Sequence, residues 1–153
     1  MNKGFNKAGQ AGFTLIELIV VIVILGILAA TALPKFTGLS GDARKASLQA
    51  ARGALSASSA MLHGRWLVDP SKTSFPTEGG PAVTIVNGYP AATADFASAA
   101  GLGDDYTPTV VGTTLRIAPK NIPSTMTTCY IFYTQAGTNG IPSISTPEGY
   151  SCD

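Results

Sequence analysis

The sequence predicts an α+β protein in which a long N-terminal helix packs on a small antiparallel sheet of about four strands. Three observations support this class. An apolar run extends from Phe13 to Leu33, a seven-residue leucine repeat follows it, and the chain after Pro70 becomes rich in glycine, proline, threonine and short β-branched runs. The chain has 153 residues, which is enough for one domain with a modest hydrophobic core.

The apolar run is long enough to cross a bilayer. As a helix, Phe13 to Leu33 would measure about 31 Å, which matches the hydrocarbon core of a membrane. Glu17 is the one ionisable residue inside it, and such a residue in a membrane segment indicates a function or a partner. Two other hypotheses remain open: a signal peptide cleaved at Ala30-Thr31-Ala32, and a permanent membrane anchor.

The residues around Glu17 carry a resemblance. The stretch Gly12-Phe13-Thr14-Leu15-Ile16-Glu17-Leu18, after a short basic leader, resembles the processing site of type IV pilins and of the type II secretion pseudopilins. The resemblance implies that a prepilin peptidase cuts between Gly12 and Phe13 and methylates the new Phe13 amine. Residues 1–12 would be the leader peptide, and residues 13–34 would form the transmembrane helix that later becomes the filament core.

The resemblance also implies partners and a location. The subunit would lie in the inner membrane, surrounded by lipid, until the assembly machinery of that membrane adds it to a homopolymer, the extracellular pilus. Glu17 would then pair with the Phe13 amine of a neighbouring subunit. A local interpretation stays open beside this one, because Thr14-x-x-Glu17 also fits a capping box at the start of a helix.

Residues 35–68 are predicted to form the amphipathic half of the long helix. Leu48, Leu55 and Leu62 repeat at seven-residue intervals with Ala51 between them, which gives one apolar stripe suited to packing on a sheet. Asp69-Pro70 is a stop signal that should end the helix.

Gly26 and Pro34 interrupt the helical pattern, and the stretch 38–41, which ends at Gly41, is a second weak point. One interpretation is a gentle curvature tolerated in a membrane helix. The other is implied by the resemblance to pilins: the segment from Gly26 to Pro34 would lose its helical form when packed in a filament.

Residues 69–153 are predicted to form a β-rich globular head. Val83 to Val86 lead into the turn signal Asn87-Gly88. A short helix is expected at 93–100, and strands at 109–111, 114–118, 127–134 and 143–145. The pentapeptide 86–90 and the alanine-rich helix after it resemble the mannose-sensitive haemagglutinin branch of pilins.

Cys129 and Cys152 are the two cysteines of the chain, and neither belongs to a CxxC pair. A disulfide formed in an oxidising compartment is the simplest interpretation, and two unrelated buried thiols are the alternative. In type IVa pilins a C-terminal disulfide loop of this kind forms an exposed, variable surface.

Several functions are not expected. Charged residues make up 12% of the chain and the net charge is +1, so there is no electrostatic basis for a direct nucleic-acid ligand. His63 is the only histidine, which gives no basis for a catalytic triad, a cofactor or a small-molecule substrate. Asp104-Asp105 lacks further spaced oxygen ligands, so a solvated turn is expected there and no metal.

These observations together predict a non-enzymatic, major-type pilin of a type IVa pilus that serves attachment, motility or both. A type II secretion pseudopilin, a minor pilin and a secreted binding protein with an ordinary signal peptide are the alternatives.

Overall fold

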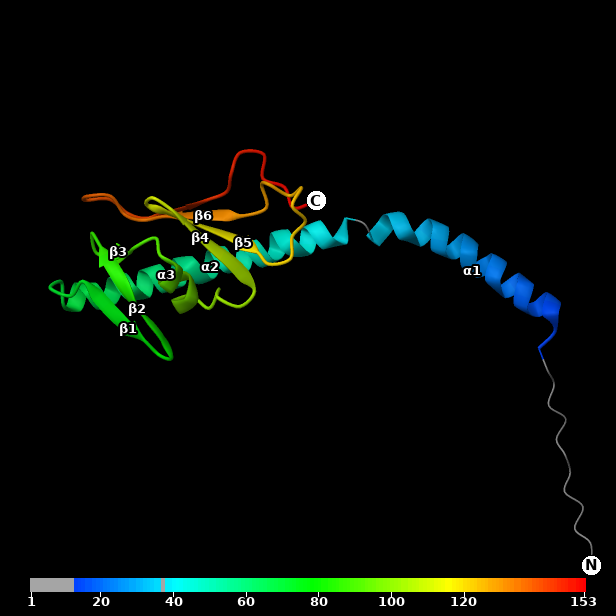
Figure 1. Cartoon of the computed structure of the whole chain (residues 1–153), viewed down its shortest axis with the longest axis horizontal. Coiled ribbons are helices and arrows are strands. Elements are labelled where there is room, and N and C mark those ends of the chain that lie inside the picture. Colours follow the sequence, from blue (N-terminus) through cyan, green and yellow to red (C-terminus); the bar gives the residue numbers. More distant parts are fainter. Residues whose placement is uncertain (1–12, 37) are drawn as a thin grey trace, which may run out of the picture. The chain divides into compact units, whose positions relative to one another are not determined.

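The structure, a computed structural model, describes residues 13–36 and 38–153 (Figure 1). The chain divides into two compact units, Met1–Gly38 and Leu39–Asp153. In the described part, the first unit contains helix α1 (Leu15–Phe36), and the second contains two helices and seven strands. These are α2 (Leu39–Val68), β1 (Ser74–Thr77), β2 (Gly80–Val86), β3 (Tyr89–Pro90), α3 (Ala94–Ala99), β4 (Tyr106–Val111), β5 (Thr114–Pro119), β6 (Ile131–Thr134) and β7 (Ser143–Ser145). The predicted α+β class is confirmed.

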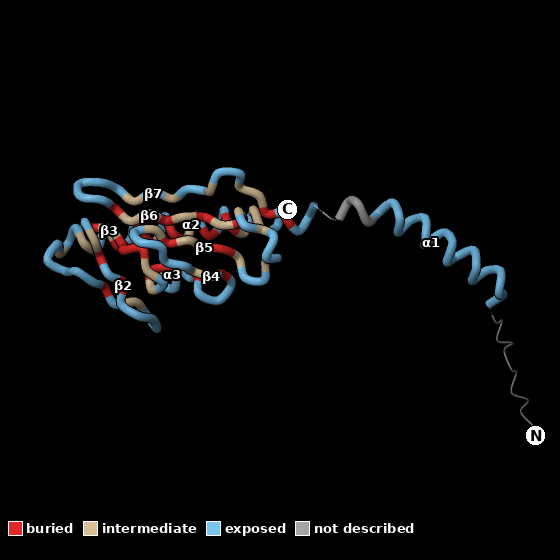
Figure 2. Tube along the Cα trace, turned by 45° about the horizontal axis from the view of Figure 1, so that its top comes forward, coloured by how far each residue is buried: buried red, intermediate tan, exposed pale blue. Residues whose placement is uncertain are grey.

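Helix α2 buries a single stripe of side chains. Leu48, Ala51, Leu55, Ser59 and Leu62 are all buried, and they are spaced three or four residues apart, which places them on one helical face. This confirms the apolar stripe predicted from the leucine repeat. Because the opposite face remains exposed within this unit, the helix can pack on the sheets along one side only (Figure 2).

Helix α2 ends at Val68, immediately before the predicted stop signal. Asp69 turns the chain: its Oδ1 accepts hydrogen bonds from the Ser71 hydroxyl at 2.6 Å and the Ser71 amide at 3.3 Å. The bond from the Ser71 side chain holds the pKa of Asp69 below its ordinary value. The carboxylate therefore stabilises the turn that Pro70 begins.

The first sheet has the strand order β1-β2-β3 and is antiparallel. Strands β2 and β3 are joined by Asn87-Gly88, both with positive φ (53° and 84°), as the predicted tight turn requires. Gly88 is also needed for close packing, because a Cβ at this position would lie 3.0 Å from the Trp66 ring on α2. The hairpin therefore turns tightly and packs closely against α2.

The second sheet has the order β4-β5-β6-β7 and is also antiparallel. Along each central strand, successive side chains point alternately to the inner and the outer face of the sheet. Leu115 and Ile117 of β5 and Ile131 and Tyr133 of β6 are buried, whereas Arg116 between the first two lies half-exposed on the other face.

Strand β4 is an edge strand that contains a proline. The pair Val111↔Thr114 closes the two-residue turn between β4 and β5. Counting back along the alternating ladder places Pro108, opposite Ile117, at a position whose backbone nitrogen points away from β5. Proline is tolerated at such a position because that nitrogen has no ladder bond to lose.

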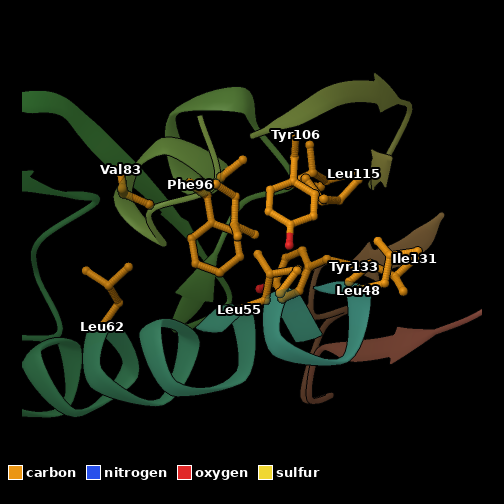
Figure 3. Packing of buried hydrophobic residues seen from close by; sticks show 14 of the residues in the cluster. Leu48, Leu55, Leu62, Val83, Phe96, Tyr106, Leu115, Ile131 and Tyr133 are labelled. Carbon is orange, nitrogen blue, oxygen red and sulfur yellow. The ribbon is translucent and has the colours of Figure 1, made fainter. Parts of the chain in front are cut away.

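The core lies between α2 and the two sheets (Figure 3). Leu48, Leu55 and Leu62 point from the helix toward side chains from both sheets and α3. The aromatic ring of Phe96 packs at 4.7 Å from that of Tyr133, in a tilted arrangement. The largest fully buried side chains are Tyr133, Phe96, Leu48, Leu55, Leu115, Ile117, Ile131 and Val83.

Three hydrogen bonds join the two sheets. The Tyr133 hydroxyl donates to the Pro90 carbonyl at 2.8 Å, the Ala92 amide donates to Gln135 Oε1 at 3.0 Å, and Asn87 Nδ2 donates to the Ala136 carbonyl at 2.9 Å. Each pairs a side chain with a backbone group, and two of the three join residues that follow a strand. The sheets are therefore held together by specific polar contacts as well as by the core.

The structure corrects two details of the predicted head. A separate three-stranded sheet exists, and its first strand β1, with Pro76 inside it, was not predicted. Strand β6 begins at Ile131 and not at Thr127, because the Thr127 amide donates to the Thr125 carbonyl in a turn. The short helix α3 lies where expected, and its N-cap is Thr93, whose side chain accepts from the Phe96 amide.

Candidate functional site

The start of α1 is a capped helix terminus. Thr14 precedes the first helical residue, Leu15, and its Oγ1 accepts a hydrogen bond from the Glu17 amide at 3.3 Å. The Leu18 amide donates to the Thr14 carbonyl at 3.2 Å. This is the geometry of a threonine N-cap, so the backbone donors of the first turn are partly satisfied without the Glu17 side chain.

Glu17 lies in the first turn of α1, one turn after Phe13, and its side chain is exposed. A carboxylate at this end of a helix is favoured by the helix dipole. Because the threonine supplies the cap, the carboxylate oxygens remain accessible to a positively charged partner. Gly12, the predicted residue before the cleavage site, lies outside the described residues.

After Glu17, helix α1 presents an exposed apolar surface from Leu18 to Leu28. Its large side chains from Phe13 to Leu28 are between 46% and 90% exposed (Figure 2). The segment Leu15–Ala32 is long and apolar enough to cross a membrane. An apolar surface of this extent requires lipid or protein to cover it.

Helix α1 continues through both positions where an interruption was predicted. Residues 15–36 are helical, which includes Gly26 and Pro34. The Thr31 hydroxyl donates to the Leu28 carbonyl at 2.9 Å, which offers that carbonyl a side-chain partner. Nothing lies within 4 Å of a Cβ built on Gly26, so close packing inside this chain does not explain the glycine.

Cys129 and Cys152 form a disulfide, with their Cα atoms 4.7 Å apart. Both residues are fully buried. The Thr128 hydroxyl donates to the Ser151 carbonyl at 3.4 Å beside the bridge. The bond therefore ties the last residues of the chain to the segment that leads into β6.

The C-terminal segment packs on the first turns of α2, a contact that was not predicted. Gly41, expected to be a weak point, is instead a buried residue of α2. The Asp153 carboxylate lies so close to its backbone that a Cβ at position 41 would collide with it. The Arg44 guanidinium donates to the Cys152 carbonyl at 3.3 Å, and Lys45 Nζ donates to Asp153 Oδ2 at 2.5 Å. We call these five residues the C-terminal clamp.

Charge and hydrogen bonding act together at the clamp. The hydrogen bond with Asp153 raises the pKa of Lys45, and the same bond lowers the pKa of Asp153. Burial raises the pKa of the neighbouring Tyr150 phenol. No local sequence signal identifies this site, because the partners of Gly41 come from the opposite end of the chain.

His63 is a packing residue. Its ring stacks on that of Tyr89 at 4.0 Å and 3°, and Nδ1 lies 2.8 Å from the Gly88 carbonyl oxygen. The Trp66 ring also stacks with the His63 ring, with the two centroids 5.9 Å apart. The histidine thus fixes the β2–β3 hairpin on α2. Among the described residues, no three His, Cys, Asp or Glu side chains are grouped so that they could hold a metal ion.

Comparison with known families identifies the N-terminal segment. The family model for the prokaryotic N-terminal methylation motif matches residues 7–33. No curated protein and no solved structure matches the chain. The matched range includes Phe13, Glu17 and most of the exposed apolar helix. The chain therefore carries the prepilin signature of the type IV pilins and pseudopilins, whose subunits are structural and polymerise after processing by a prepilin peptidase.

Proposed function

We propose that the protein is a major-type subunit of a type IVa pilus. The observation that carries the proposal is the pairing of an exposed apolar helix with one carboxylate in its first turn, directly after the predicted processing site. Residues 1–12 are the leader in this proposal, and residues 13–34 anchor the subunit in the inner membrane. The chain then acts by assembly and not by catalysis.

Assembly transfers the apolar surface of α1 from lipid to neighbouring copies. Because lipid is as apolar as a neighbouring helix, this transfer gains close side-chain packing and little hydrophobic free energy, and the packing is non-directional. The pairing of Glu17 with the methylated Phe13 amine of a neighbour supplies direction, because a charge pair in an apolar environment tolerates little displacement. Glu17 therefore sets the register between subunits.

Gly26 and Pro34 supply extension in the proposed filament. The structure has this segment helical in the single chain, but proline removes one helical hydrogen bond and glycine lowers helix propensity by about 1 kcal/mol relative to alanine. The segment between them is therefore the part of α1 that unwinds most easily when neighbouring helices pack around it.

The head is the surface of the pilus in this proposal. The disulfide-closed segment after β6 forms part of that surface, and the pilus serves attachment, motility or both. The sequence resemblance of residues 86–90 and of the alanine-rich helix after them is the basis for proposing a place in the mannose-sensitive haemagglutinin branch.

The first experiment is intact mass and N-terminal sequencing of material sheared from the cell surface. Filaments whose subunits begin at methylated Phe13 support the proposal. A soluble chain beginning at Leu33 would establish a secreted protein with an ordinary signal peptide instead.

A type II secretion pseudopilin is the second candidate, because it shares the same methylation motif. Pseudopilin heads more often depend on calcium, whereas this head contains a disulfide. A head that melts at lower temperature with a reductant but not with a chelator supports the pilin. The reverse result supports the pseudopilin.

A further inference from the structure

The outer face of the second sheet carries a single arginine among hydroxyl and aromatic side chains. In the strand register, one row across β4, β5, β6 and β7 consists of Thr109, Arg116, Phe132 and Ser145. The Arg116 guanidinium lies over the Tyr130 ring, 4.0 Å from its centroid. The aromatic rings therefore hold the arginine on the face that points away from α2.

An open hollow of about 450 Å³ lies beside this arginine. Val111, Tyr130 and Phe132 line the hollow together with Arg116, and hydroxyl side chains complete it. Arginine and aromatic residues are enriched at the core of protein interfaces, where lysine and acidic residues are depleted. The composition of this face therefore favours a protein partner.

Arg116 has no anionic partner in its own chain. Over residues 13–36 and 38–153, ion pairs within 4.0 Å are confined to Lys45. Arg116 Nε is buried without a hydrogen-bond partner, so an incoming group has to meet the terminal nitrogens of the guanidinium from the hollow. Those nitrogens suit a carboxylate, which accepts charge-assisted hydrogen bonds from arginine.

The charges of the head are divided along the chain. Residues 73–105, which form the first sheet, α3 and the loop after it, contain four acidic residues and no lysine, arginine or histidine. Residues 106–147, which form the second sheet, contain Arg116 and Lys120 and no acidic residue. Surfaces of opposite charge attract when two molecules meet, so this division favours a second copy of the chain as the partner.

The four acidic residues differ in their surroundings. Glu78 lines the same hollow as Arg65, which places a cation near it. Asp95 lies in the first turn of α3, where the helix terminus favours a negative charge. Asp104 and Asp105 have neither advantage.

The Asp104-Asp105 loop presents two adjacent, exposed carboxylates. Lys120 Nζ is the nearby cation, but it donates to the Gly103 carbonyl at 3.3 Å. In the part of the chain that the structure describes, it forms no ion pair with either aspartate. A cation from another molecule would relieve the repulsion between the two carboxylates.

We propose that the Asp104-Asp105 loop of one copy docks on the outer sheet face of the next, with a carboxylate on the Arg116 guanidinium. The two surfaces differ and each copy has both, so the contact repeats head to tail without closing. The inference rests on the proposed function, because a filament brings the heads of successive copies together. It adds a contact between heads to the assembly through α1.

The first test is cross-linking in filaments of the full chain. Gly103→Cys with Thr109→Cys puts one thiol beside each surface and keeps Arg116 and both aspartates, and a Cβ at position 103 meets only ordinary contacts. Both native cysteines are already in the disulfide. A short bis-maleimide should join this variant into a ladder of covalent multimers. Thr73→Cys with Thr109→Cys is the matched control and should give no ladder.

The outcomes separate this contact from the proposed function. A ladder from the first pair alone supports the contact. Filaments without a ladder, or with equal ladders from both pairs, overturn the contact and leave the proposed function intact. A native chain that forms no filaments overturns the proposed function and this contact with it.

A double-mutant cycle tests the charge pair. Arg116→Gln should raise the release of subunits from sheared filaments in detergent by about threefold or more, and so should Asp104→Asn with Asp105→Asn. Because the groups act as one pair, all three substitutions together should release no more than either variant. Lys72→Gln, an exposed lysine outside both surfaces, should behave as the native chain. Additive effects overturn the pairing.

Arginine-specific labelling reports on any other occupant of the face. Phenylglyoxal should label Arg116 in detergent-solubilised subunits and not in filaments, because the neighbouring head covers it. Equal labelling in both leaves the face open to a partner outside the filament and overturns the proposal.

Discussion

The Lys45 ammonium donates a hydrogen bond to the Asp153 carboxylate at 2.5 Å, and the backbone of Gly41 lies directly beneath that carboxylate. One contact thus joins the beginning of α2 to the last residue of the chain. Because Cys152 is bonded to Cys129, the same contact also connects α2 to the segment before β6.

The clamp should depend on pH in a defined window. The pKa of Asp153 is lowered from 3.8, so its contribution is present above that value and is lost as the pH falls through the folded pKa. The pKa of Lys45 is raised from 10.5, so its contribution is present below that value and is lost as the pH rises through the folded pKa. Amide exchange corrected for intrinsic rates should therefore show constant protection of residues 41–47 between the two limits and weaker protection outside them. A variant Asp153→Asn should lose that dependence at the acidic limit.

Gly41→Ala should act against the usual preference of helices for alanine. The new methyl group displaces Asp153 and crowds the Cys152 carbonyl, and we expect a loss of about 1 kcal/mol in the free energy of unfolding. Gly53→Ala is the matched control on the same helix, since nothing lies within 4 Å of its Cβ, and it should gain up to about 1 kcal/mol. Denaturant unfolding followed by Trp66 fluorescence measures both. Equal gains in the two variants would show that the clamp does not restrict Gly41.

Tyr133 should make the head unstable in alkali. Burial raises its pKa from 10.0 to about 12, so the phenol favours the folded state below pH 10, and this contribution is lost as the pH rises from 10 to 12. The expected loss is about 2–3 kcal/mol across that range. Tyr133→Phe should remove the slope and should also cost about 1 kcal/mol at neutral pH, because the Pro90 carbonyl loses its donor. Tyr130→Phe at the half-exposed outer face should leave the alkaline slope as it is.

Removal of the disulfide should loosen both ends of the head. Cys129→Ser with Cys152→Ser should lower the free energy of unfolding by about 3 kcal/mol on the chain-entropy model. Because Cys152 and Asp153 hold the first turns of α2, exchange of amides 41–47 should accelerate along with those of β6. Acceleration confined to β6 would mean that the clamp persists without the bridge.

Glu17→Gln should separate assembly from helix capping. The Thr14 side chain caps the helix through the Glu17 amide, so the substitution should leave α1 helical. Loss of a charge-assisted hydrogen bond should reduce the yield of sheared filaments by about tenfold or more, while the membrane-bound subunit accumulates. Glu148→Gln, an exposed acid in the head, should assemble normally. Normal filament yield from Glu17→Gln would leave the carboxylate without a role in assembly.

Local pattern was sufficient to predict much of this fold. The leucine repeat predicted the buried face of α2, and Asn87-Gly88 predicted a hairpin, because in both cases the signal and the structure lie within a few residues of each other. Strand β1 was missed since Pro76 and a single buried residue, Phe75, give it no alternating pattern.

The sequence predicted only those functional residues that lie close to one another along the chain. Phe13 and Glu17 lie within one turn of each other, and a specific motif contains both. The role of Gly41 arises from tertiary packing, which brings together residues from α2 and from the last fifth of the chain. Glycine at position 41 looks like a helix breaker until its partner is known.

The proline in β4 has a consequence for a subunit made to self-associate. Exposed sheet edges recruit strands from other molecules, and a protein concentrated in a membrane before use is at risk of joining by the wrong surface. At Pro108 the free edge lacks one of the donors that an incoming strand would need. Growth through one helix requires that strands do not add to the edges of the sheet. The missing backbone N–H of Pro108 makes such addition less favourable at this edge.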